Sequence, residues 1–164
     1  MSPKVGSNGA ADWYIKSFKD SILKNSVCFL FSLKNLKSLR FDGCHLRSIP
    51  TRAFWGLSNL VSLTVATRNA GVLTIEAGAF AGLNSLEQLD LSGNYIRHLA
   101  PGVLCSLPKL TVLNLSKNEI GSLSDLGLLE VSTYLLAGLE KMHLQVEKSM
   151  YKFSATHIGL SALS

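Results

Sequence analysis

The chain has 164 residues, of which 47% are hydrophobic and 16% are charged, and its formal net charge is +5. This balance describes a globular domain, or a piece of one, and excludes a disordered chain. The basic residues are scattered and do not interleave with aromatic residues in a groove-like pattern, so the composition gives no support to nucleic-acid binding.

Residues 1–29 form a segment outside the pattern that dominates the rest of the chain. Its start is small and polar, and we expect it to be disordered. Asp12 could cap a short helix with Ile15, Phe18 and Ile22 on one face. We expect this helix to cover the first coil of the domain that follows. A helix lying on a membrane surface and a lack of stable structure are the alternatives.

Residues 30–129 form the predicted domain, because one leucine-rich motif recurs there. The clearest copy, LEQLDLSGNYIRHL at 86–99, follows the spacing L-x-x-L-x-L-x-x-N-x-L. The four copies start at Leu36, Leu60, Leu86 and Leu110, so the first and last intervals are equal and the middle one is longer. The second copy therefore carries about two extra residues, which we place within 66–71, before Val72 and Ile75 return to the core. No such motif is found one repeat length before Leu36, so the first coil is expected to be half a coil.

The spacing has a physical cause. Leu89 and Leu91 flank Asp90, so a strand here points both leucines inward and leaves the carboxylate in solvent. Asn94 follows the strand and can hydrogen-bond backbone groups of neighbouring coils. The same position in other copies gives a predicted structural ladder, made of Cys44, Asn94 and Asn118.

One coil cannot bury its own apolar face, so the coils must stack. The predicted fold class is an α/β solenoid. It is a right-handed leucine-rich-repeat superhelix with short parallel strands on its concave face and helical segments at both ends. Its open ends predict aggregation or dimerisation of the isolated chain.

Residues 130–164 leave the repeat. Leu135, Leu139, Met142 and Val146 are spaced three or four apart, which indicates an amphipathic helix. We expect it to cover the last coil, and an unrelated tail is the alternative.

The outward strand positions form a polar, nearly neutral surface. Such a surface suits contact with another macromolecule rather than with a small molecule. The predicted protein-binding residues of the concave face are Arg40, Asp42, Thr64, Gln88, Asp90 and Asn114.

The sequence predicts no enzyme. It contains no glycine-rich phosphate loop, no G-x-S-x-G and no H-E-x-x-H. Cys44 and His45 are adjacent and would point apart, and Cys28, Cys44 and Cys105 are not spaced as a zinc site. We therefore predict no catalytic residue, cofactor or metal.

Two features of the sequence concern membrane insertion and export from the cell. No apolar stretch approaches the roughly 20 residues that span a bilayer, and the N-terminal segment lacks the apolar core of a secretory signal. We expect no membrane span in this chain. Asn114-Leu115-Ser116 nevertheless matches the acceptor sequence for N-linked glycosylation, although a repeat strand favours the same residues.

These residues resemble a known family. The phrases AFWGL and AFAGL are typical of extracellular repeats of this length, and the segments 60–72, 86–96, 104–107 and 113–128 look like repeats of long insect-type Toll receptors. The two flanks do not share this resemblance. It implies part of a receptor ectodomain that binds a protein ligand or another receptor, on the extracellular side of the plasma membrane in the parent protein, in innate immune or developmental signalling. The alternatives are another extracellular adhesion or matrix protein, a truncated gene product without independent signalling, and an intracellular repeat adaptor.

Overall fold

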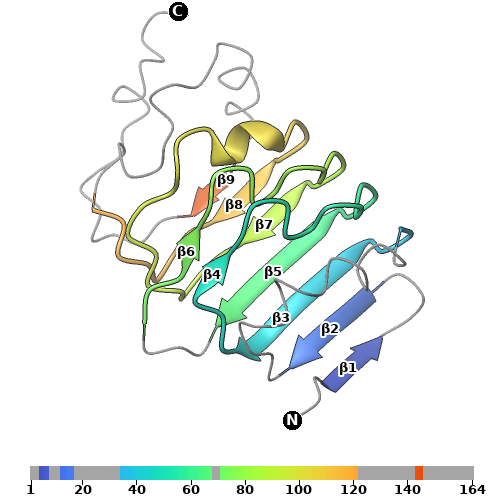
Figure 1. The fold of residues 1–164 in the computed structure, drawn as a ribbon, viewed down its shortest axis with the longest axis horizontal. Coiled ribbons are helices and arrows are strands. Elements are labelled where there is room, and N and C mark those ends of the chain that lie inside the picture. The colour runs from blue at the N-terminus through green and yellow to red at the C-terminus, as the bar shows by residue number, and fades with distance from the viewer. Residues whose placement is uncertain (1–3, 8–11, 17–33, 68–70, 122–142, 146–164) are drawn as a thin grey trace, which may run out of the picture.

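The structure is a computed structural model, and it describes residues 4–7, 12–16, 34–67, 71–121 and 143–145. A seven-stranded sheet runs along one side of the molecule (Figure 1). In spatial order its strands are β1 (Lys4–Ser7), β2 (Asp12–Lys16), β3 (Ser38–Cys44), β5 (Ser62–Thr67), β7 (Gln88–Asp90), β8 (Val112–Asn114) and β9 (His143–Gln145). Neighbours from β2 to β9 are parallel, and β1 is antiparallel to β2.

The repeated motif sets the register of the central strands. Leu39, Leu63, Leu89 and Leu113 are paired in succession across β3, β5, β7 and β8, and all four side chains are buried. The predicted stacking of leucine-rich coils into a parallel ribbon is confirmed. These inward leucines form one continuous core with Leu36, Leu60 and Leu86, and the partly buried Leu110 packs against it.

A second, short sheet closes the core opposite the first. It pairs β4 (Ser48–Ile49) in parallel with β6 (Thr74–Ile75), and Figure 1 shows both strands in a separate layer. This pairing locates the extra residues of the second copy. Phe41 pairs with Val65 and Ile49 with Ile75, so eight residues (49 − 41) correspond to ten (75 − 65). Within that longer connection Leu73 is buried and Val72 only half-buried, so Val72 was the wrong choice of core residue.

The back of each coil is a run of tight turns with the same hydrogen bonds. In the first, Ala53 N donates to Pro50 O, and Leu57 N donates to Phe54 O. The turns after Glu76 and Ala100 repeat the arrangement, and the last includes the 3-10 helix η2 (Val103–Ser106). Each turn buries an aromatic residue or a leucine, of which Phe54 and Phe80 are fully buried.

Neither flank is helical where the structure describes it. The predicted helix beginning at Asp12 is wrong over Asp12–Lys16, which form β2 and pair with β3. The first coil therefore does possess a strand, and the interval from Asp12 to its partner Ser38 is longer than the interval from Ser38 to Ser62. The expectation of a disordered start is wrong at Lys4–Ser7, which form β1; Ile22 and most of the predicted helix lie outside the described residues.

The predicted C-terminal helix is wrong over His143–Gln145. These residues form β9 and extend the sheet in parallel beyond β8, where His143 pairs with Val112 across a longer stretch of chain than separates the central strands. Leu135, Leu139 and Val146 lie outside the described residues. The division of the chain at residues 29 and 129 stays a prediction.

One backbone position recurs in a left-handed conformation where the chain turns away from the sheet. Gly43 and Gly93 occupy it with φ of 63° and 69°, but Lys117 occupies it with φ of 58° in the last described coil. A side chain in this conformation costs roughly 1–2 kcal/mol, whereas glycine adopts it freely.

We therefore expect Lys117→Gly to stabilise the protein. The lysine is exposed, so little packing is lost, and after the greater flexibility of glycine in the unfolded chain the net gain should be about 0.5–1 kcal/mol in the free energy of unfolding. Urea titration of both proteins measures it. Lys109→Gly, at an exposed position without positive φ, is the matched control and should destabilise. If both variants are less stable than the natural protein, the backbone strain inferred at Lys117 is wrong.

Candidate functional site

The outward side chains of four strands share one surface, which we call the sheet face. The register aligns them in rows across the sheet, and all are half-buried or exposed while the inward residues that alternate with them are buried. The first row is Ser38, Ser62, Gln88 and Val112, the second is Arg40, Thr64, Asp90 and Asn114, and Asp42 and Ala66 begin the third. The structure thus brings all six predicted binding residues onto one face.

The sheet face carries charges of both signs on a mostly uncharged surface. Arg40 is exposed on β3 and Asp42 is half-buried two residues further along. Asp90 on β7 is half-buried, and its Oδ1 accepts a hydrogen bond from Ser92 N at 2.9 Å. This face is therefore polar, weakly charged and held in shape by its own backbone contacts.

Behind the sheet face, two asparagines join the coils. Asn94 is completely buried, and its Nδ2 donates to the carbonyls of Leu91 in its own coil and Val65 in the preceding coil, each at 2.7 Å. Its Oδ1 accepts from both N and Oγ1 of Thr67, at 2.9 and 2.8 Å. Each polar atom of the side chain thus has two partners.

Asn118 repeats this arrangement one coil later. Its Nδ2 donates to the carbonyls of Leu91 and Leu115, both at 2.9 Å, and its Oδ1 accepts from Asn94 N and Ile96 N, both at 3.0 Å. The buried backbone groups after each strand are satisfied in this way.

Cys44 is buried in the first coil, and Thr67 stands in register with it across β3 and β5. The sequence reasoning missed Thr67, because a register shift after Asp42 brings this residue to the ladder position. The available signal was the alternation along β5, which places Thr67 on the same inward side as Leu63 and Val65.

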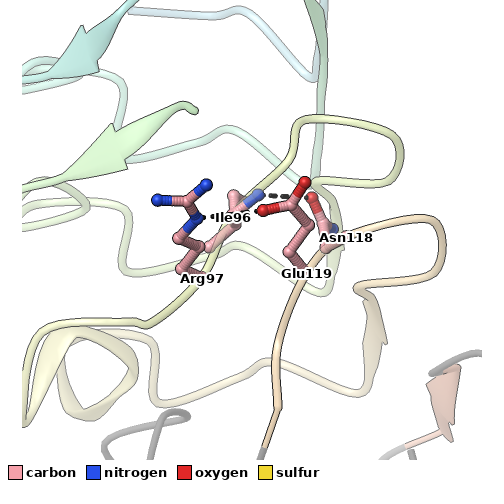
Figure 2. Close-up of polar contacts among 4 residues, drawn as sticks. All are labelled: Ile96, Arg97, Asn118 and Glu119. Atoms are coloured by element: carbon pink, nitrogen blue, oxygen red, sulfur yellow. Dashed lines mark hydrogen bonds and ion pairs between the residues drawn. The ribbon is translucent and has the colours of Figure 1, made fainter. Parts of the chain in front are cut away.

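At one lateral edge, a surface ion pair joins the last two described coils. Arg97 Nε lies 2.9 Å from Glu119 Oε2, beside the bond from Ile96 N to Asn118 (Figure 2). The two side chains are 66% and 46% exposed, so the pair contributes about 0–1 kcal/mol. The half-buried Asn118, whose side chain bonds both coils, therefore joins them more firmly than the charges do.

The described residues show no sign of a reactive centre. Among them, no three His, Cys, Asp or Glu side chains gather as a metal site would require. Cys44 and Cys105 are free thiols, the first buried and the second exposed, and Cys28 lies outside the described part. No helix within that part is long and apolar enough to cross a membrane.

Comparison with known proteins also identifies leucine-rich repeats in this chain. Residues 67–120 match the leucine rich repeat family model. The chain is 30% identical to Toll-like receptor 7 of Drosophila melanogaster over 97% of its own length and 11% of that protein's length. It is 32% identical to leucine-rich repeat-containing G-protein coupled receptor 5 of Xenopus tropicalis over 56% of the chain, and 35% identical to Toll-like receptor 4 of Bos taurus over 63%. In each of these relatives the matched region is 11–12% of the protein's length.

The extent of the Drosophila match corrects one expectation. Both flanks were expected not to resemble the family, yet the alignment covers 97% of the chain and so includes most of each flank. The strands β2 and β9, which lie in these flanks, agree with that extent because both join the same sheet as the repeats.

Proposed function

The chain is a leucine-rich-repeat protein similar to Toll-like receptors, and we propose that its sheet face is the docking surface for a protein partner. One observation carries the proposal. The register places the outward side chains of β3, β5, β7 and β8 in continuous, mostly polar rows, while the opposite side of the same strands is buried in the core. This construction gives a rigid surface that is open on one side.

The chemistry of the sheet face favours a protein over a small molecule. Arg40 and Gln88 are exposed and can hydrogen-bond a partner, and Val112, which pairs with Gln88 on the neighbouring strand, is 37% exposed. Interfaces that bind proteins combine such a polar rim with a few anchoring contacts over a broad area. The role proposed here is binding without catalysis.

The setting of this surface is also part of the proposal. Similarity to proteins named as receptors supports a place in the ligand-recognition part of a larger receptor, outside the cell, with either a protein ligand or another receptor ectodomain as partner. Signalling in immunity or development would belong to that larger protein, because the matched region is about a tenth of each receptor's length.

A bulky charge in the middle of the sheet face tests this proposal. Thr64 is half-buried at the centre of the second row, so Thr64→Arg should obstruct a docked protein and weaken binding about tenfold or more. The probe is a panel of secreted and cell-surface ectodomains from the source organism, expressed individually and screened pairwise against the full chain by surface plasmon resonance.

Asn84→Arg makes the same change of charge at an exposed position on a turn outside the sheet face, and it should leave binding unchanged. The proposal requires that the unmodified chain bind at least one ectodomain of the panel. It is wrong if the chain binds none, or if Thr64→Arg and Asn84→Arg bind equally well.

A further inference from the structure

We propose that Asn114 carries an N-linked glycan, which shields the β8 side of the sheet face and confines the docked protein to β3 and β5. The inference rests on the extracellular setting proposed above. Asn114-Leu115-Ser116 is the one N-x-S/T sequence in the chain. The structure shows why a sugar at this residue is compatible with the folded solenoid.

The amide of Asn114 is oriented by its own acceptor sequence. Its Oδ1 accepts hydrogen bonds from Ser116 Oγ at 2.8 Å and from Ser116 N at 3.1 Å. These two bonds direct the oxygen toward the turn after β8. Among the described residues, none accepts a hydrogen bond from Asn114 Nδ2, so a sugar on this nitrogen would displace no contact seen there.

The ladder asparagines provide the contrast. Nδ2 donates to two backbone carbonyls in Asn94 and to three in Asn118, and Asn94 is completely buried. A sugar on either nitrogen would break those bonds, and a sugar on Asn94 would also not fit the core. Asn114 is half-buried on the outward side of β8, where its row continues across the sheet face.

The modification is a balanced group transfer. Asn114 Nδ2 forms a bond to C1 of an oligosaccharide carried on a polyprenyl diphosphate. The bond from C1 to the diphosphate oxygen breaks, the diphosphate leaves with the electron pair, and the nitrogen loses one proton. The donor lipid and the transferase belong to the secretory pathway, through which an extracellular receptor passes.

The neighbouring strand supplies a natural comparison. Asp90 at the end of β7 pairs with Asn114 at the end of β8, and each is followed by Leu-Ser. Asp90 Oδ1 likewise accepts a hydrogen bond from the backbone two residues later. Aspartate has no amide nitrogen and cannot be modified. The natural chain can therefore carry a glycan on β8 and none on β7, which leaves β3 and β5 open.

The first experiment asks whether the site is used. The full chain is translated behind a secretion signal in the presence of microsomes, and only the chain that is protected from added protease is scored. We expect a shift in mobility that peptide N-glycosidase removes, leaving aspartate at position 114 in the peptide mass spectrum. Asn114→Gln and Ser116→Ala should each abolish the shift, and Asn94→Gln should keep it. An unmodified Asn114 in the protected chain overturns the proposal.

The second experiment tests which strands of the sheet face stay accessible to the partner when Asn114 carries a glycan. Asp90→Asn creates an equivalent acceptor sequence one strand closer to Thr64, so the protected chain should carry two glycans. The partner found in the ectodomain panel should bind the natural glycoprotein and Asn114→Gln with affinities within threefold, but bind the doubly modified variant at least tenfold more weakly. Removal of the glycans enzymatically should restore binding.

The two proposals can fail separately. If Asn114 stays unmodified while Thr64→Arg still blocks the partner, the glycan is wrong and the docking surface stands. If Asn114 is modified but the second glycan leaves binding unchanged, the confinement of the partner to β3 and β5 is wrong.

Discussion

Replacement of Asn94 with alanine is expected to destabilise the protein by about 3–5 kcal/mol. The change removes four hydrogen bonds from a fully buried side chain, with Thr67 N, Thr67 Oγ1, Val65 O and Leu91 O as partners. A buried polar group left without a partner costs about 1–3 kcal/mol, and alanine leaves several such groups in two coils at once. Urea unfolding followed by circular dichroism measures the loss.

Asn84→Ala is the control, because Asn84 is exposed and its removal should change stability by no more than about 0.5 kcal/mol. If Asn94→Ala fails to fold, Asn118→Ala serves as the milder variant, since Asn118 is only half-buried. Equal stability of Asn94→Ala and Asn84→Ala would refute the ladder as a source of stability.

The second large effect is expected at Phe54. Its ring is fully buried, lies edge-on to Phe41 with centroids 6.1 Å apart, and stacks on Phe80 at the same distance with planes 8° apart. The three rings join successive coils at the centre of the core. Phe54→Ala removes the middle ring and leaves a cavity, so the free energy of unfolding should fall by about 3–5 kcal/mol.

The next residue in the chain is a demanding control. Trp55 is larger but 41% exposed, and Arg52 lies 5.0 Å above its ring. If buried area determines the cost, Phe54→Ala should lower stability more than Trp55→Ala, with Phe54→Leu between them. Urea unfolding of all three variants, followed by circular dichroism, gives the order of their stabilities. If Trp55→Ala loses more stability than Phe54→Ala, the placement of Phe54 in the core and Trp55 at the surface is wrong.

The central part of the fold could be predicted because the strand, the turn and the ladder position are each indicated by residues of the same motif. Leu89 and Leu91 alternate with Asp90, and an asparagine follows three residues later, so strand, turn and ladder are all visible in one stretch. The same reasoning predicted the location of the sheet face, since alternation along a strand fixes which side chains point outward.

The flanks could not be predicted in this way, because their strands depart from the motif. In β2, Trp13 and Ile15 take the register positions of Leu39 and Phe41, so the leucine signal is missing. In β9, Leu144 is the one leucine of a short strand, and the spacing of apolar residues around it favoured a helix. Pairing with an existing sheet edge overrode the local preference in both cases.

The ladder was predicted only in part, for a related reason. The asparagines were recognisable from their position in the motif, but Thr67 comes to the ladder through a register shift that no periodicity reveals. Likewise, the choice between Val72 and Leu73 depends on how a longer connection folds back to β6. Whether the sheet face binds a protein stays a prediction until a partner is measured.

The parallel pairing of β2, β3, β5, β7, β8 and β9 has a mechanical consequence. The hydrogen bonds between the strands of successive coils run along the length of the sheet. Tension that pulls the first and last strands apart therefore acts along those hydrogen bonds rather than across them. Such a load reaches them one strand at a time, and the molecule should yield by peeling from an end while the remaining coils stay folded. A solenoid built in this way should lengthen under low force and recoil when released.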